Sequence, residues 1–409
     1  MHNFKKRAVC LLCILTAVLS GLLGGCTAPA SQPITQEETV WYGPLGEAAF
    51  LTDDLYFFLS KDKMLLSCTD VNTGVTVPLC NKVMCMHDDV YCEASIASDQ
   101  FAPIFFWNDG LYYTEADGYG THLYRRNPDG TGLSRVATLC EEAMKEDDVN
   151  IYISFSIMAD GKFYFLADIT TVSREGDVLI SKTAKIQICC VDLRSGKQTV
   201  IAEYLGDDNQ ITLLAAGGNS VVYSLAKRLT IGMTDPQYAN ALKASAVKLI
   251  RADEKTKEQT VIFEKAWADF YNPKFFNGSI LYYPYNSDAN VHRRTAFDLN
   301  TGKETPSTLI GTSMINEEYG IKTFWDPEQK SICVVANKTG TRLPLELPAS
   351  FLRLKAVSSR GLVLQATEMY LYDDEEAPHE TTLYYIPISA LPDGIQAADA
   401  VNIYSYRHH

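Results

Sequence analysis

Short runs of aromatic and β-branched residues recur along most of this chain, and residues typical of tight turns separate them. The clearest copy joins Phe105, Phe106 and Trp107 to a second run at Leu111, Tyr112 and Tyr113 through the turn Asn108-Asp109-Gly110. Such runs suit a pleated, half-buried surface, and Asn-Gly or Asp-Gly pairs accept the positive φ of tight hairpins. The pattern predicts a small antiparallel sheet.

The same unit recurs along the chain at a spacing of about 50 residues. A sheet of this size cannot bury both faces alone, so successive copies must stack, and radial stacking gives a propeller. We predict an all-β fold, a β-propeller of about seven four-stranded blades over residues 45–409, with six or eight blades as alternatives. Further copies centre on Asp53-Asp54, Asp160-Gly161, Gly217-Gly218-Asn219, Asn277-Gly278 and Ser358-Ser359-Arg360-Gly361.

Helical signals are sparse and predict only short insertions. The best begins at Asp235 and Pro236, where Asp235 can cap free amides and proline suits the first turn, and continues over residues 237–248. It interrupts the fourth unit. A second short helix is predicted over residues 139–146.

The repeated unit resembles the blades of the YWTD propellers of the low-density-lipoprotein-receptor type. It is more similar still to a set of Firmicutes-type lipoproteins, of unknown function, with the segment "dgkLYY … LyrmdldG". Here Gly110 to Tyr113, and then His122 to Gly130, match that segment, although no Tyr-Trp-Thr-Asp tetrad occurs. The resemblance covers residues 45–395 and implies a fold, not a function.

The first 26 residues have the pattern of an export signal. Lys5, Lys6 and Arg7 precede an apolar stretch over residues 8–23, which is too short to span a bilayer comfortably. The stretch ends in Leu23-Gly24-Gly25-Cys26, which looks like the lipobox of bacterial lipoproteins. We predict a signal peptide over residues 1–25 and a lipid on Cys26.

Residues 26–44 predict a flexible tether, because residues 27–40 contain two prolines, three threonines, one serine and two glutamines with little apolar material. Two or three acyl chains give lasting attachment, since each buried methylene contributes about 0.8 kcal/mol. The predicted location is therefore the extracytoplasmic face of the cell membrane, with the membrane as a partner through the lipid.

The formal net charge of −14 changes the list of possible partners. An acidic body is repelled by phosphate backbones, so we expect no nucleic acid. The chain also lacks a Gly-x-Ser-x-Gly elbow, a phosphate-binding glycine loop and a His-Glu-x-x-His pair.

The sharpest local motif gathers Cys80, Cys85, His87 and Cys92 into 13 residues. In an exported protein, the first interpretation is a structural disulfide within this loop, with the third cysteine bound to Cys68 or Cys140. The second is a zinc site, because three thiolates and an imidazole can supply tetrahedral ligands. A third leaves the cysteines unlinked. We predict no cofactor, with zinc as the alternative.

These observations leave two hypotheses for function. The first is a non-catalytic, lipid-anchored binding module whose ligand is an envelope protein, a glycan or a peptide. The alternative is a carbohydrate-active enzyme of the envelope, a lyase or a hydrolase, whose acid and base converge near the propeller pore from distant blades. We predict no catalytic residue.

Overall fold

The protein is described here by a computed structural model, which gives the structure of most of the chain after residue 38. The described residues are 39–45, 49–60, 63–87, 91–96, 103–117, 120–145, 149–175, 178–229, 234–285, 294–307, 309, 313–325, 330–347, 351–367 and 379–408. The predicted signal peptide and Cys26 lie outside these residues. They belong to a separate unit of residues 1–38, and residues 39–409 form the other unit.

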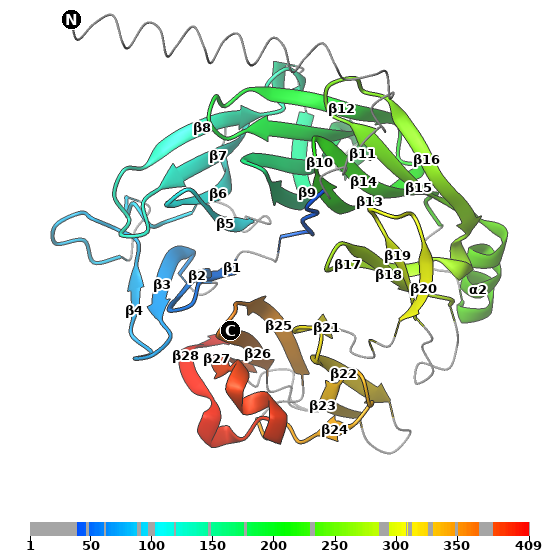
Figure 1. The fold of residues 1–409 in the computed structure, drawn as a ribbon. Helices are drawn as coiled ribbons and strands as arrows, with labels where there is room; N and C mark the ends of the chain where they lie inside the picture. Colours follow the sequence, from blue (N-terminus) through cyan, green and yellow to red (C-terminus); the bar gives the residue numbers. More distant parts are fainter. Residues whose placement is uncertain are drawn as a thin grey trace, which may run out of the picture. The chain divides into compact units, whose positions relative to one another are not determined.

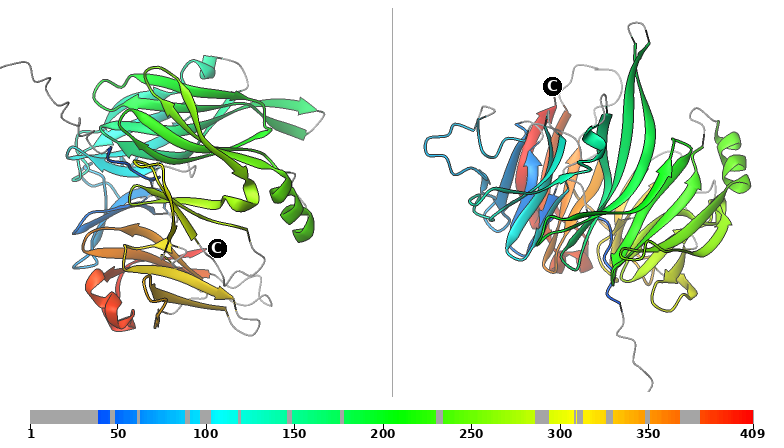
Figure 2. Two further views of the ribbon diagram at one scale, coloured as in Figure 1. Left: turned by 45° about the vertical axis from the view of Figure 1, so that its right-hand side comes forward. Right: turned by 90° about the horizontal axis from the view of Figure 1, so that it is seen from above.

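Residues 49–408 form seven antiparallel sheets of four consecutive strands each, arranged in a ring (Figures 1 and 2). This confirms the predicted seven-bladed β-propeller. The first blade contains β1 (Ala49–Leu51), β2 (Leu55–Ser60), β3 (Leu65–Asp70) and β4 (Thr76–Pro78). The second contains β5 (Ile104–Trp107), β6 (Gly110–Asp117), β7 (Gly120–Arg126) and β8 (Ser134–Leu139). The third contains β9 (Val149–Ala159), β10 (Lys162–Glu175), β11 (Val178–Asp192) and β12 (Gln198–Leu205).

The remaining four blades follow in the same order along the chain. They are β13 (Asn209–Gly217), β14 (Ser220–Lys227), β15 (Ala246–Asp253) and β16 (Gln259–Ala266); β17 (Tyr271–Phe276), β18 (Ser279–Tyr283), β19 (Arg294–Asp298) and β20 (Glu304–Ser307); β21 (Ser313–Met314), β22 (Tyr319–Trp325), β23 (Lys330–Ala336) and β24 (Arg342–Leu343); and β25 (Phe351–Val357), β26 (Gly361–Thr367), β27 (His379–Pro387) and β28 (Val401–His408).

The turns that the sequence marked are the links between the first and second strands of the blades. Asn108 and Asp109 have φ values of 46° and 57°, and Asn277 has a φ of 49°. These are left-handed conformations that asparagine, aspartate and glycine adopt at low cost. Each turn therefore reverses the chain within two residues, as a blade requires.

The ring closes between its first and last blades without any exchange of strands, because each described sheet uses four strands that are consecutive in sequence. Apolar side chains of both blades form one core cluster, in which Tyr56 and Phe58 meet Val363 and Tyr385. Thr76 also donates a hydrogen bond from its hydroxyl to the carbonyl of Ile403, at 2.9 Å. Closure thus depends on apolar packing with a few cross-links.

The helical insertions are shorter than predicted. The helix α2 (Asp235–Ala244) lies between β14 and β15 of the fourth blade, as expected, but residue 248 already belongs to β15. Its cap position is Thr234, not Asp235, and the Thr234 amide donates to Gln237 Oε1 at 2.9 Å. The short helix predicted over residues 139–146 is reduced, among the described residues, to the 3₁₀ turn η1 (Ala143–Lys145), since β8 extends to Leu139.

Three further 3₁₀ turns occur in the described chain: η2 (Trp267–Asp269), η3 (Ile388–Asp393) and η4 (Ala397–Asp399). None of the described helices is long and apolar enough to cross a membrane.

Residues 39–45 pack against the inner strands of the propeller, inside the stretch that the sequence assigns to the tether. Tyr42 exchanges two backbone hydrogen bonds with Ala216 of β13, and the amide of Leu45 donates to the carbonyl of Ser156 on β9 at 2.7 Å. Gly217 permits this approach, because a side chain there would collide with the Val40 carbonyl. The compact body therefore begins at residue 39.

Candidate functional site

The structure brings Cys80, Cys85, His87 and Cys92 together in the segment between β4 and β5. The three sulfur atoms and a ring nitrogen all lie within 4.8 Å of one another. His87 Nδ1 is 3.4 Å from Cys92 Sγ. All eight cysteines that follow Cys26 are free thiols here. The four side chains thus form one compact cluster of nitrogen and sulfur donors.

Both ends of this segment are fixed to β3, the third strand of the first blade. The Leu66 amide donates to the carbonyl of Ala94, and the Leu66 carbonyl accepts a hydrogen bond from Leu79, each at 2.8 Å. Ser95 forms an isolated bridge with Leu65. One short piece of β3 therefore holds the residues next to Cys80 and Cys92.

Arg126 of β7 joins the same two ends from the second blade. Its guanidinium donates to the carbonyl of Leu79, to that of Glu93 at 2.7 Å, and to the Tyr113 hydroxyl at 2.9 Å. The side chain is 1% exposed. Leu79 precedes Cys80 and Glu93 follows Cys92, so one buried cation links both ends of the cysteine segment.

The immediate surroundings perturb two of the thiols in opposite directions. Burial raises the pKa of the Cys80 thiol, but backbone and thiol hydrogen bonds to its sulfur outweigh burial and lower the pKa overall. The backbone donors are the amides of Lys82 and Glu93. Burial, together with the two neighbouring thiols, raises the pKa of Cys92 to about 11. Cys80 is therefore the thiol of this pair that ionises more readily.

Four other cysteines pack in hydrophobic core clusters that do not include these four donors. Cys68 lies in a core cluster between the first two blades, whereas the thiols of Cys140 and Cys189 both accept from the side-chain amide of Gln198. Neither Cys68 nor Cys140, the two partners predicted for a third loop cysteine, belongs to the cluster of Cys80, Cys85, His87 and Cys92. Cys189 and Cys190 contribute to different core clusters, because neighbouring residues of a strand point to opposite faces.

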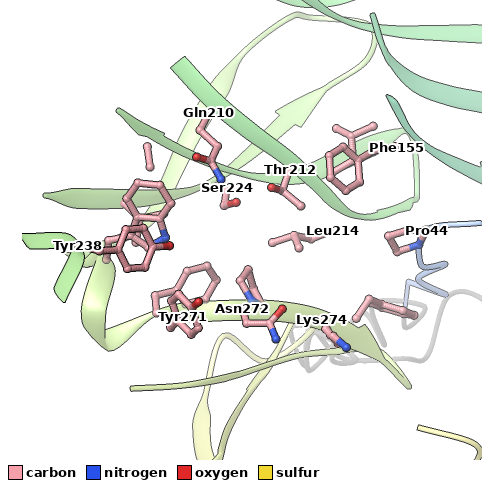
Figure 3. A pocket seen from close by; sticks show the side chains of 17 residues that line it. Pro44, Phe155, Gln210, Thr212, Leu214, Ser224, Tyr238, Tyr271, Asn272 and Lys274 are labelled. Carbon is pink, nitrogen blue, oxygen red and sulfur yellow. The ribbon is translucent and has the colours of Figure 1, made fainter. Parts of the chain in front are cut away.

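A second feature is a cavity of 530 Å³ beside the inner strands β9, β13 and β17 (Figure 3). This cavity could not be predicted from the sequence, because its lining comes from three blades and contains no local motif. Aromatic rings and neutral polar groups make up most of the wall. The residues labelled in Figure 3 are Pro44, Phe155, Gln210, Thr212, Leu214, Ser224, Tyr238, Tyr271, Asn272 and Lys274.

Each of the three inner strands has a β-bulge where it borders this cavity. The unpaired residues are Phe155 in β9, Leu214 in β13, and Asn272 with Pro273 in β17. Phe155 and Asn272 have φ values of 29° and 47°, and 46% of Phe155 is exposed. Bulges re-aim side chains and concentrate next to functional sites. Three of them around one cavity therefore mark it as a candidate binding site.

Tyrosines form one side of the cavity. Tyr271 packs edge-on against Tyr285 with ring centroids 5.0 Å apart, and Tyr238 meets Tyr285 at 6.0 Å. The Asn272 side-chain amide donates to the Tyr283 hydroxyl at 3.0 Å. Burial raises the pKa of Tyr271 to about 12, so its hydroxyl stays protonated at neutral pH. This wall presents fixed rings together with hydroxyl and amide groups.

No family model and no curated protein matches this chain. Similar solved structures include an oligogalacturonate lyase in complex with manganese, 14% identical with a TM-score of 0.48, covering 82% of this chain and 86% of that one. The β-propeller domain of the Trilobed protease from Pyrococcus furiosus is 9% identical, with a TM-score of 0.48 over 89% of this chain and 98% of that chain.

An oligogalacturonate lyase from Vibrio parahaemolyticus is 12% identical, with a TM-score of 0.40 over 87% of this chain and 85% of that one. The class of protein is therefore defined by the structure itself: a seven-bladed β-propeller.

Proposed function

We propose that this protein is a lipid-anchored binding module on the extracytoplasmic face of the cell membrane, and that it binds an oligosaccharide in the cavity between β9, β13 and β17. The observation that supports this most is the group of three bulged strands around one cavity. The lipobox-like end of the first 26 residues supports the anchor.

The lining is mostly aromatic or neutral and polar, with Lys274 as its one basic side chain, and this chemistry favours a glycan. The apolar C–H face of a sugar ring packs on an aromatic ring, while amides and hydroxyls hydrogen-bond the sugar hydroxyls. Phe155 and Tyr271 offer such rings, and Gln210 and Asn272 offer amides. Concave sites of this kind combine apolar walls with a few polar groups that orient the ligand.

Binding of the propeller body, residues 27–409, to an array of bacterial, plant and host glycans tests the ligand. We expect selective binding that Phe155→Ala reduces at least tenfold, because the mutation removes the exposed ring. Tyr152→Ala is the matched control, since Tyr152 is also on β9, is 39% exposed and does not line the cavity. Equal losses in both variants, or no glycan bound, would refute the proposed ligand.

Cell fractionation tests the anchor separately. Cys26→Ala removes the thiol that would take the lipid, so the variant should appear in the soluble extracytoplasmic fraction. If it stays wholly with the membrane, the anchor proposal fails.

A further inference from the structure

We propose that Cys80, Cys85, His87 and Cys92 bind one zinc ion, which holds the segment between β4 and β5 in its conformation. This inference is independent of the glycan ligand and of the lipid anchor. It rests on the geometry of the four donors, on the burial pattern of the segment and on the charge of Arg126.

The donor positions fit a tetrahedral site. Zinc binds thiolate sulfur at about 2.3 Å and imidazole nitrogen at about 2.0 Å, so tetrahedral neighbours lie about 3.5 to 3.8 Å apart. Cys92 Sγ and His87 Nδ1 are 3.4 Å apart, and the whole set lies within 4.8 Å. Shifts of about an ångström in the side chains would therefore close the site.

In this segment the large apolar side chains are exposed, whereas the donor residues are buried or half-buried. Val83 and Met84 are 91% and 94% exposed, and Met86 and Tyr91 are 79% and 76% exposed. Cys92, by contrast, is 4% exposed. Hydrophobic burial therefore contributes little to the outer part of the segment, because its large apolar side chains face solvent while its donors face inward. A bound metal would supply the missing stabilisation.

The backbone of the segment also contains local strain. Met84 and His87 have φ values of 62° and 58°, a conformation that costs residues other than glycine about 1–2 kcal/mol each. Met84 directly precedes Cys85, and His87 carries the imidazole. Strained conformations persist where the surroundings fix them, as at ligand sites. Coordination of Cys85 and His87 would offset this cost.

The charge of Arg126 gives a further argument, separate from those above. Three thiolates, a neutral imidazole and Zn²⁺ have a net charge of about −1. Arg126 is fully buried, its hydrogen-bond partners are two carbonyls and a phenol, and the described residues form no ion pair with it. A guanidinium buried without a counter-charge is costly. The zinc–thiolate centre would provide that counter-charge beside residues to which Arg126 already donates.

A disulfide accounts for less of this arrangement. It would join two of the three thiols and would leave the third thiol and the imidazole unexplained. Zinc uses all four, and binding releases one proton from each thiol while the imidazole binds as a neutral ligand.

The zinc content of the purified full-length protein, prepared without chelator or reducing agent, tests the site. We expect one zinc per chain, loss of that zinc in Cys92→Ser, and retention in Cys333→Ser. Cys333 is the matched control, since it is a buried cysteine in β23, far from the cluster in sequence. Protein without zinc, two mass units lighter per cysteine pair, would overturn the proposal in favour of a disulfide.

A second pair of variants keeps the test decisive if Cys92→Ser fails to fold. His87→Cys preserves four tetrahedral donors, so it should retain zinc, whereas His87→Ala should bind it at least tenfold more weakly. Cobalt substitution should give the strong visible absorption of a tetrahedral thiolate site in the wild type. If His87→Ala retains zinc with unchanged affinity, or if the cobalt spectrum shows no thiolate ligands, these four residues do not form the site.

Discussion

Replacing Arg126 with methionine should loosen the cysteine segment selectively, because this guanidinium joins both of its ends. Methionine keeps much of the apolar volume but donates no hydrogen bond. The mutation removes three hydrogen bonds and leaves the Leu79 and Glu93 carbonyls without that donor. The hydrogen bond to Leu79 is buried and the one to Glu93 is part-buried, and an unsatisfied buried acceptor costs about 1–3 kcal/mol. Relief from burying a charge offsets part of this, so we expect a net local loss of about 3 kcal/mol.

Hydrogen exchange followed by mass spectrometry measures this loss directly. A local loss of about 3 kcal/mol corresponds to exchange more than about a hundredfold faster in peptides covering residues 79–96. Arg125→Met is the control, since it makes the same substitution one residue earlier, at a half-buried position on the other face of β7. The reasoning is refuted if both variants exchange alike in this segment.

Two further predictions concern the turns between the third and fourth strands of the blades. Lys257 has a φ of 63°, and the equivalent turn of the next blade has Gly302 with a φ of 68°. Lys257→Gly should therefore stabilise the protein by about 0.5–1 kcal/mol, and Gly302→Ala should destabilise it by a similar amount. Urea denaturation measures both changes in the free energy of unfolding. Gly302 has open space around it, so only backbone strain contributes. Backbone amides three residues on hold the pKa of Asp192, Asp253 and Asp298 below the usual value. Their contribution to stability is therefore present above about pH 4 and is lost as pH falls through the lowered pKa values, and Asp298→Asn should flatten the acid side of the stability profile.

The blade pattern could be predicted because its determinants are local. A turn such as Asn277-Gly278 needs a positive φ, and the aromatic run after it needs a half-buried strand. Both requirements fall within a few residues, so each blade is visible in the sequence. The end of α2 was harder to place, because residues 246–248 have helix-compatible side chains but pair with β16. Tertiary pairing there prevailed over local propensity.

The cavity could not be predicted, because its position depends on register. Phe155 is unpaired in β9 only because Ser154 and Ser156 pair with consecutive residues of β10. Nothing in the sequence around Phe155 indicates that shift. The same holds for Leu214 in β13, and the two residues meet at one cavity only after the blades assemble. A site built by several blades leaves no local motif.

The cysteine segment lies between these two cases. Its spacing alone allowed a disulfide, a metal site or unlinked thiols, because sequence distance does not say which way a side chain points. The structure adds the directions: the donors turn inward while Val83 and Met84 face solvent. It also adds Arg126, a residue 34 positions beyond Cys92 whose role no spacing in the segment could suggest. Among the described residues, buried Arg126 meets only neutral partners, which is costly, and a zinc–thiolate centre would provide a counter-charge that a neutral disulfide would not.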